Sequence, residues 1–261
     1  MKYRTVNKSK VMTILVTILF LVNFSTSKYA ASAAESKPYF KDLYKTNFTS
    51  EAQADKAKKV NPKDTQTLLY YANFYYIRGA LLPPGNKTAA EYIGKAFVVY
   101  KILWKKDFTN PRIQILMANA YASQGANPEL NIQTLIEYIF RSRNLYSLVV
   151  DRYPDNLEAR LGRIRINMNL NSATGRPDII HRADIKVYIE GYSKLPIDVK
   201  ENPYFKNGLM EVYLAQAMLD VEEKNWIEVE KQMILIDTAL LHSHALKLYQ
   251  DVEKKLDRSK K

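Results

Sequence analysis

Apolar residues recur at helical spacing along most of the chain, and the stretch 89–104 shows the clearest stripe. Its apolar side chains return every three or four positions, while charged and polar side chains fill the positions between them. The stripe consists of Ala89, Ile93, Ala96, Phe97, Tyr100, Leu103 and Trp104. This spacing puts the apolar side chains on one face of a helix, which is stable only when a second helix covers it. The pattern therefore predicts amphipathic helices that pack on one another.

One ten-residue phrase occurs twice, as YYANFYYIRG at 70–79 and as LMANAYASQG at 116–125. Both copies contain Ala-Asn-x-Tyr-x-x-x-Gly, and they lie 46 positions apart. The same step leads to a degenerate window around Asn167 and to a weaker copy around Tyr213. A fixed period of this length is typical of stacked helical units. We therefore predict four related units, two of them clear and two divergent.

Each of the four copies of the repeated sequence is preceded by residues that typically start a helix. Pro at the first helical position loses no hydrogen bond that it needed, so Asn-Pro is a suitable start. The expected starts of the first helices are Asn61-Pro62, Asn110-Pro111, Pro154-Asp155-Asn156 and Asn202-Pro203. The first of the expected second helices begins at a capping box, Thr88 to Glu91. The other three are expected at 131–152, 178–195 and 225–239, and a closing helix is expected at 241–256. The predicted fold is all-α, with about four helix pairs and a C-terminal capping helix.

Small and aromatic residues recur in the repeated phrase for a packing reason. Helices approach closely only where their contact residues are small. We expect Ala72 and Ala118 to make room for a neighbour, and Gly79 and Gly125 to end the first helices. The tyrosines that fill the space beside them are Tyr75, Tyr121 and Tyr213.

The phrase LMANAYASQG resembles the first-helix signature of tetratricopeptide repeats, and VVDRYPDN (149–156) resembles the junction between two such repeats. The resemblance covers roughly residues 61–238, with a longer period than the 34 residues of the family. It implies a right-handed solenoid of helical hairpins with a concave face. It further implies that Asn73 and Asn119 lie on that face, where asparagine amides bind the backbone of an extended peptide.

Three other residues complete the expected concave face. Arg165 and Glu211 fall near the asparagine position in the two weaker windows, and Tyr76 belongs to an excess of aromatics too large for one buried stripe. The alternative interpretation of the two asparagines is a hydrogen bond between neighbouring helices. The sequence leaves both interpretations open.

The N-terminus has the pattern of an export signal. A basic leader is followed by the apolar run 11–24 and then by small residues, which predicts cleavage after Ala33. An uncleaved anchor is the alternative, and it would keep the protein at a membrane. The expected organisation is a signal peptide at 1–33, a tether or short helix at 34–60, repeats at 61–239, and a capping helix with a basic tail at 240–261.

Composition and charge narrow the function classes. The chain has 261 residues and no cysteine, which excludes disulfides, thiolate catalysis and cysteine-bound zinc. The formal net charge is +12, of which residues 1–33 hold +5 and the remainder +7. Basic side chains do not form a dense block interleaved with aromatics, so the sequence does not predict nucleic-acid binding.

Known catalytic motifs are missing from the sequence. It has no phosphate-binding glycine loop, no nucleophile elbow and no His-Glu-x-x-His. His242 and His244 lie two positions apart, so on a helix they point in different directions and predict no metal site. We therefore expect no cofactor, no metal and no enzymatic activity.

The expected function is that of an exported scaffold or adaptor that binds a protein or peptide in the periplasm or cell envelope. One alternative is a periplasmic small-ligand-binding protein or transporter accessory subunit of the same fold. A hydrolase with dispersed catalytic residues is the third hypothesis. The sequence identifies neither the partner nor the oligomeric state.

Overall fold

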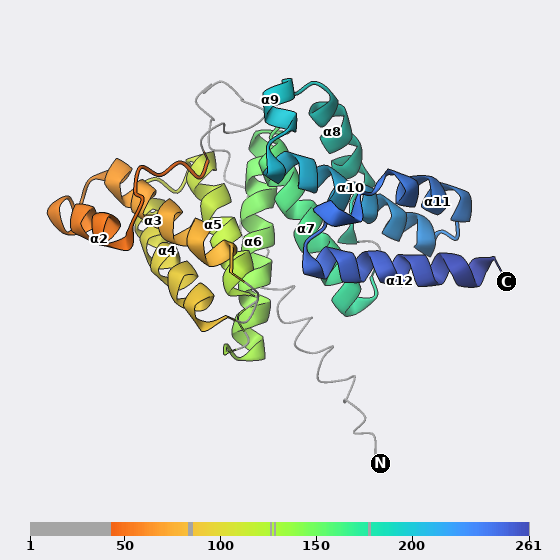
Figure 1. The fold of residues 1–261 in the computed structure, drawn as a ribbon, viewed down its shortest axis with the longest axis horizontal. Helices are drawn as coiled ribbons and strands as arrows, with labels where there is room; N and C mark the ends of the chain where they lie inside the picture. Colours follow the sequence, from red (N-terminus) through yellow and green to blue (C-terminus); the bar gives the residue numbers. More distant parts are fainter. Residues whose placement is uncertain (1–42, 83–85, 126, 128, 177–178, 261) are drawn as a thin grey trace, which may run out of the picture. The chain divides into compact units, whose positions relative to one another are not determined.

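A computed structural model describes residues 43–82, 86–125, 127, 129–176 and 179–260 (Figure 1). These residues belong to one compact unit, Ser36–Lys261. Every regular element in the described residues is a helix, so the all-α prediction is confirmed. The predicted signal peptide and residues 34–42 of the predicted 34–60 tether lie outside the described residues. No described helix is both long and apolar enough to cross a membrane.

The helices follow one another with short connections. In chain order they are α2 (Glu51–Val60), α3 (Thr65–Ala80), α4 (Lys87–Lys106), α5 (Pro111–Gln124), α6 (Ile132–Arg152), α7 (Leu157–Thr174), α8 (Arg182–Ser193), α9 (Ile197–Lys200), α10 (Pro203–Glu222), α11 (Trp226–Leu235), the 3-10 turn η2 (Thr238–Leu240) and α12 (Ser243–Ser259).

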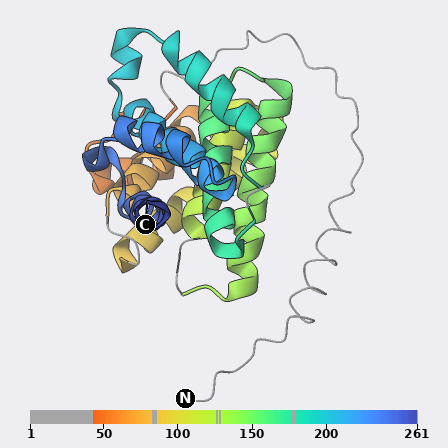
Figure 2. The same ribbon diagram turned by 90° about the vertical axis from the view of Figure 1, so that its right-hand side faces the viewer.

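Consecutive helices pack on each other. The pairs α3–α4, α5–α6 and α10–α11 have the most extensive contacts, and α4–α5 and α6–α7 join successive pairs. Two views at right angles show α6 beside α7 (Figure 1) (Figure 2). Towards the C-terminus the order is less regular, because α10 contacts α7, α8, α11 and α12. Packing in adjacent pairs is therefore observed, while the solenoid stays a prediction.

The first helix of each pair starts at a strict interval. The N-cap residues are Asp64, Asn110, Asn156 and Asn202, each 46 positions after the one before. In every case the side-chain oxygen accepts a hydrogen bond from a backbone N–H of the first turn, as for Asp64 Oδ2 and Thr67 N at 2.7 Å. Such caps satisfy N–H groups that have no partner inside the helix.

Several predicted helix ends were wrong by a few residues. Asn61 caps the end of α2 rather than starting α3. The expected capping box is not used, because Asn86 accepts from Ala89 N at 3.2 Å and α4 already begins at Lys87. α8 covers Arg182–Ser193, so it starts later and ends earlier than the expected 178–195. Pro196 disfavours a helical backbone at Leu195, which fits the early end.

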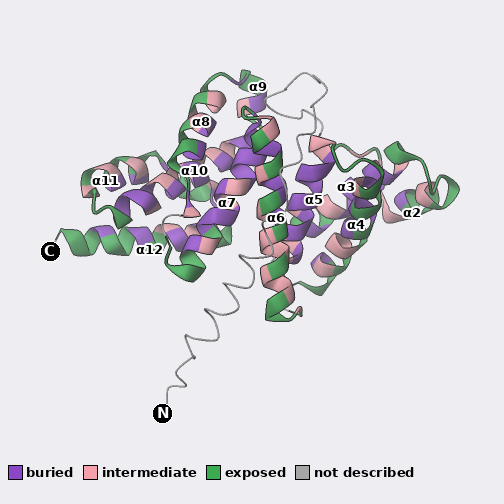
Figure 3. Ribbon diagram, turned by 180° about the vertical axis from the view of Figure 1, so that it is seen from behind, coloured by how far each residue is buried: buried purple, intermediate pink, exposed green. Residues whose placement is uncertain are grey.

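The last two helices are also shifted. α11 ends at Leu235, before the expected Ala239, because Ile236 takes an extended backbone and Asp237 then caps the 3-10 turn. α12 begins two residues later than Leu241 and continues to Ser259. One face of α12 is exposed, as expected for a terminal helix (Figure 3).

The two repeated glycines allow close approach and do not form left-handed caps. Gly79 lies inside α3, and Gly125 follows α5 with φ −63°, which is right-handed. A Cβ on Gly79 would lie 2.7 Å from Ile93 Cγ1, and a Cβ on Gly125 would lie 3.0 Å from Ile139 Cγ1. Ile93 and Ile139 are themselves 46 positions apart. The repeated glycine therefore serves the same contact in both pairs.

Buried apolar side chains form two clusters. The first extends from Leu43 to Ile166 and the second from Leu157 to Leu256, so α7 contributes to both. Among the predicted packing residues, the fully buried ones are Ala72, Tyr75 and Ala118. Tyr121 is buried at 7% exposure and Tyr213 is half-buried. Burial of this apolar surface is the main force that holds the pairs together.

Candidate functional site

Four equivalent positions on the first helices form what we call the repeat face: Asn73, Asn119, Arg165 and Glu211. They lie on α3, α5, α7 and α10, each 46 positions from the next. The caps at Asp64 and its equivalents fix this register, because each repeat-face residue follows its N-cap by nine positions.

Asn73 is fully buried and all of its amide is used. Its Nδ2 donates to the carbonyl oxygens of Leu43 at 3.2 Å and Lys45 at 2.7 Å. Its Oδ1 accepts from the Tyr100 hydroxyl at 2.8 Å. The side chain thus joins helix α4 to the chain that precedes α2.

Asn119 repeats this arrangement in the second pair. Its Oδ1 accepts from the Tyr146 hydroxyl on α6, and its Nδ2 donates to the Tyr44 hydroxyl. Tyr146 is 46 positions after Tyr100, so the asparagine–tyrosine pair is part of the repeat. One end of each amide therefore accepts a hydrogen bond from the next helix, as the alternative interpretation expects, and the other end binds residues 43–45 of the same chain. Binding of a partner's backbone by these amides stays a prediction.

We call residues 43–48 the N-terminal segment. It has no helical structure and begins with a turn at Leu43 and Tyr44. From Tyr44 to Phe48 its side chains alternate between the protein and the solvent. The Tyr44 ring stacks on Tyr76 at 5.4 Å and 7°, and the Phe48 ring meets Phe74 edge-on at 6.4 Å. Lys45 and Asn47, between these inward residues, are exposed. The alternation is that of an extended chain.

Two further hydrogen bonds fix the N-terminal segment. The Thr46 hydroxyl donates to the Tyr70 carbonyl at 3.0 Å, and Arg112 Nη2 donates to the Leu43 carbonyl at 3.3 Å. Leu43 itself is 5% exposed and belongs to the first apolar cluster. Backbone polar atoms and alternate side chains of the segment are therefore both recognised.

The predicted Tyr76 lies beside this segment. Its ring is covered by Tyr44, and its hydroxyl lies 3.2 Å from Ser123 Oγ on α5. Tyr76 thus connects the repeat faces of the first two pairs through one ring and one hydrogen bond.

The C-terminal half of the repeat face is charged. Arg165 donates to Glu211, and the second Glu211 oxygen lies 3.3 Å from His242 Nδ1. The Arg165 guanidinium also lies over the Tyr204 ring, 5.1 Å from its centre. Tyr204 is in turn 6.4 Å from Tyr44, centre to centre. The five predicted binding residues thus lie along one connected row, although each already has a partner within the chain.

Burial controls the tyrosine hydroxyls in this row. It raises the pKa of Tyr100 well above its usual value, and it does the same for Tyr44 and Tyr146 with added repulsion from neighbouring tyrosines. These phenols therefore stay protonated at physiological pH. A protonated phenol donates a hydrogen bond, which is what both asparagine oxygens accept.

Sequence reasoning missed the N-terminal segment and the two tyrosine partners. A signal for Tyr100 and Tyr146 existed, because they share the 46-residue step with Asn73 and Asn119. The segment LYKTNF has large apolar or aromatic residues at 43, 44 and 48 around three polar residues, which is not a strict alternation, and it occurs only once in the chain.

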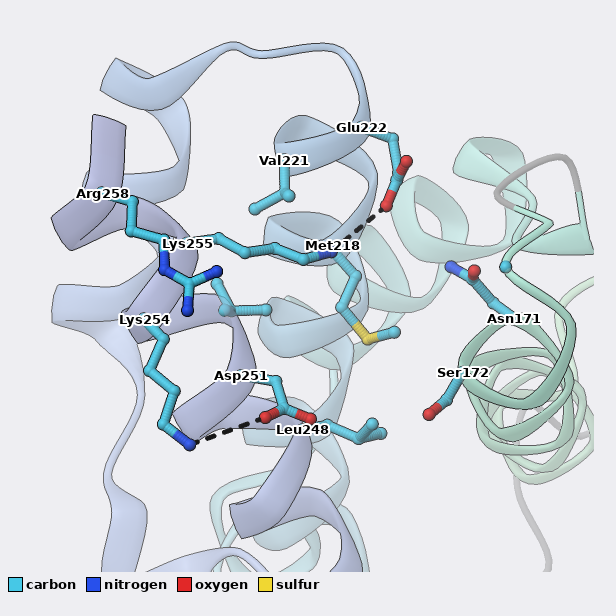
Figure 4. Close-up of a pocket in the computed structure, with 12 residues that line it drawn as sticks. Asn171, Ser172, Met218, Val221, Glu222, Leu248, Asp251, Lys254, Lys255 and Arg258 are labelled. Carbon is cyan, nitrogen blue, oxygen red and sulfur yellow. Dashed lines mark ion pairs between the residues drawn. The ribbon is translucent and has the colours of Figure 1, made fainter. Parts of the chain in front are cut away.

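A pocket of about 350 Å³ lies apart from the repeat face, between α7, α10 and α12 (Figure 4). Its lining includes the apolar side chains Met218 and Leu248 and the members of two ion pairs. Lys255 lies 3.5 Å from Glu222, and Lys254 lies 3.9 Å from Asp251. Much of the charge that lines the pocket is thus paired within the protein.

No group of three histidine or acidic side chains in the described residues is placed to hold a metal ion. His242 contacts Glu211, and the rings of His242 and His244 are 6.4 Å apart. Comparison of the chain with protein-family models, curated proteins and solved structures finds no match. The resemblance to tetratricopeptide repeats accordingly stays a prediction.

Proposed function

We propose that the protein is an exported, non-enzymatic scaffold of tetratricopeptide-like helix pairs, which binds an extended segment of a partner protein in the cell envelope. The observation that carries this proposal is the pair of hydrogen bonds from Asn73 to the carbonyls of Leu43 and Lys45. One side chain here binds the backbone carbonyls of two residues of the N-terminal segment, where the chain turns at Leu43 and Tyr44.

This contact has the chemistry of peptide recognition. The two carbonyl oxygens are within reach of one amide group because the chain turns at Leu43 and Tyr44. On a fully extended chain, alternate carbonyls would lie about 6.6 Å apart, too far for one nitrogen atom to bond both. Backbone contacts give affinity for any extended sequence, and pockets for alternate side chains give specificity. The repeat face offers both kinds of contact, with Asn73 for the backbone and the rings of Tyr76 and Phe74 for side chains.

Partner capture from envelope extract tests the proposal. The bait is the full chain, either wild type or carrying Asn73→Ala with Asn119→Ala. We expect the double variant to lose the partner, since it lacks both amides of the repeat face. Equal recovery by both baits would remove the repeat face from partner binding.

A control is needed because Asn73 is buried and its loss also destabilises the protein. Gly79→Ala is suitable, since the added Cβ would press on Ile93 in the α3–α4 contact and leaves the asparagine amides in place. If Gly79→Ala loses the partner to the same degree as the double variant, the loss reflects instability rather than binding.

The small-ligand alternative would be supported by an enclosed apolar cavity. The pocket between α7, α10 and α12 has instead a partly charged lining with internal ion pairs. This lining gives no specific support to a bound solute, so the peptide-binding proposal is preferred.

A further inference from the structure

The proposed function leaves open what kind of segment a partner presents. We propose that the N-terminal segment is a tethered occupant of the repeat face, and that the partner displaces it with a segment of the same pattern. The pattern is an apolar residue followed by an aromatic, then a small hydroxyl residue two positions after that aromatic, and a second aromatic two positions later. This inference rests on the proposed function and specifies its ligand.

The pattern follows from the contacts of the segment. Tyr44 stacks on Tyr76, and its hydroxyl accepts from Asn119. Phe48 meets the edge of Phe74. These two contacts require planar rings, and the first also favours a hydroxyl on the ring.

The position between the two rings is restricted in a different way. The Thr46 hydroxyl donates to the Tyr70 carbonyl at 3.0 Å, and its Oγ1 also accepts from Phe48 N at 3.3 Å. A serine or threonine fits this role. Asn47 is exposed, so its position accepts any residue.

The segment is able to leave without unfolding the helix that follows it. α2 has its own N-cap, in which Ser50 Oγ accepts from Gln53 N at 3.3 Å. α2 is also anchored independently, because Asp55 accepts from the Tyr75 hydroxyl at 2.9 Å and Glu51 accepts from Tyr92. The contacts that hold the segment and those that hold α2 therefore involve different residues.

A tethered occupant weakens binding of any competitor. A segment joined by a short linker competes at an effective concentration on the order of millimolar. The apparent affinity of a free peptide is its intrinsic affinity multiplied by the fraction of molecules whose repeat face is open, so it is low when that fraction is small. Weakening the tethered segment should therefore strengthen binding of a peptide in trans.

The test uses the labelled peptide acetyl-LYKTNFT-amide, which reproduces residues 43–49, and the full chain. Binding is measured by fluorescence anisotropy to wild type and to Tyr44→Ala with Phe48→Ala. We expect the double variant to bind the peptide at least about tenfold more tightly than wild type. The matched peptide acetyl-LAKTNAT-amide, which lacks both rings, should bind neither protein.

Circular dichroism establishes that each variant is folded. If the double variant is not folded, Tyr44→Phe provides the same comparison, because it keeps the ring on Tyr76 and removes only the hydroxyl that accepts from Asn119. Tyr44→Phe should bind the peptide more tightly than wild type by a smaller factor.

Failure of the peptide to bind a folded variant, or equal binding to wild type and variant, would overturn the inference. That result is distinguishable from failure of the proposed function. Partner capture that is lost in the Asn73→Ala/Asn119→Ala bait would still support the repeat face as a binding surface, with a ligand of a different pattern.

Discussion

The first two helix pairs and the last two share a period but differ in chemistry. The N-caps Asp64, Asn110, Asn156 and Asn202 keep the 46-residue interval throughout. Inside the helices, the N-terminal half repeats neutral contacts: Asn73 with Tyr100, and Asn119 with Tyr146. The Tyr75–Tyr92 and Tyr121–Tyr138 ring pairs also match, at 5.5 Å and 5.3 Å.

The C-terminal half replaces these contacts with an ion pair and with a hydrogen bond from an arginine. Arg165 and Glu211, at the asparagine positions, bind each other. Asn167, at the position of Tyr75 and Tyr121, accepts from Arg143 at 2.9 Å.

The difference shows which part of the repeat is structural. Caps set where helices begin, so their period persists, whereas residues on the repeat face are free to change as long as their polar groups find partners. A neutral amide that directs its N–H groups away from the helix pair binds backbone carbonyls, as Asn73 does with Leu43 and Lys45. An arginine and a glutamate that bind each other have less capacity left for a ligand. We therefore place peptide binding in the N-terminal half.

The largest expected effect is a loss of stability on replacing equivalent tyrosines, and it should differ between the two halves. Tyr100, Tyr146 and Tyr192 occupy equivalent positions, but the first two are buried and Tyr192 is half-buried. Tyr100→Ala and Tyr146→Ala should each lower the free energy of unfolding by about 3–5 kcal/mol, because they leave a cavity and an unpaired asparagine oxygen. Tyr192→Ala should cost about 1–2 kcal/mol. Urea titrations compare the three, and equal costs would show that the halves do not differ at this position.

The next effect concerns the ion pair of the C-terminal half. Removing one member of a buried pair leaves the other without a partner, so Arg165→Ala or Glu211→Ala should cost about 1–3 kcal/mol. The Arg165 side chain is 30% exposed, and solvent screening keeps this below the cost of breaking a fully buried pair. The double variant should cost less than the sum of the single variants. Additive costs would mean that the two side chains do not interact.

A smaller effect tests the close approach of helices in the N-terminal half. Gly79→Ala should destabilise by about 1–3 kcal/mol, because the new Cβ lies within 3.0 Å of atoms on α4. Gly94→Ala is the matched control: its Cβ meets only Gln124 Nε2 at 3.9 Å. Better helix propensity should make Gly94→Ala more stable by about 0.5–1 kcal/mol. Thermal unfolding of both variants gives the comparison, and a stabilising Gly79→Ala would contradict the packing role.

The smallest effect is a pH dependence at His242. Partial burial lowers its pKa below the ordinary 6.5; Glu211 opposes this shift, and Arg165 and His244 reinforce it. The unfolded chain then binds the proton more readily than the folded one, so His242 reduces stability as pH falls through about 6.5. Wild type should lose more stability than His242→Gln between about pH 8 and pH 5. A wild type that gains on acidification relative to His242→Gln would show that attraction to Glu211 dominates.

Much of the fold was readable from the sequence for local reasons. Asn110, Asn156 and Asn202 start helices by bonding their own first turn, so their role follows from a few neighbouring residues. The ends at Leu235 and Ser193 depend on where the chain must turn to pack, which a local pattern does not determine.

The site was readable only in part. Asn73 and Asn119 stood out because their context is repeated, but Tyr100 and Tyr146 reach them across a helix pair. The contact of Asn73 with Lys45 spans 28 positions and belongs to no periodic pattern. Contacts between distant segments that occur once leave no periodic trace in a single sequence.

Competition between the captured partner and the segment peptide tests the central claim most directly. The partner is bound to the full wild-type chain, and acetyl-LYKTNFT-amide is added up to saturation. If a partner segment occupies the same part of the repeat face as residues 43–48, the peptide should release the partner, while a peptide of the same composition in scrambled order should not. A partner that stays bound at saturating peptide would contradict the account.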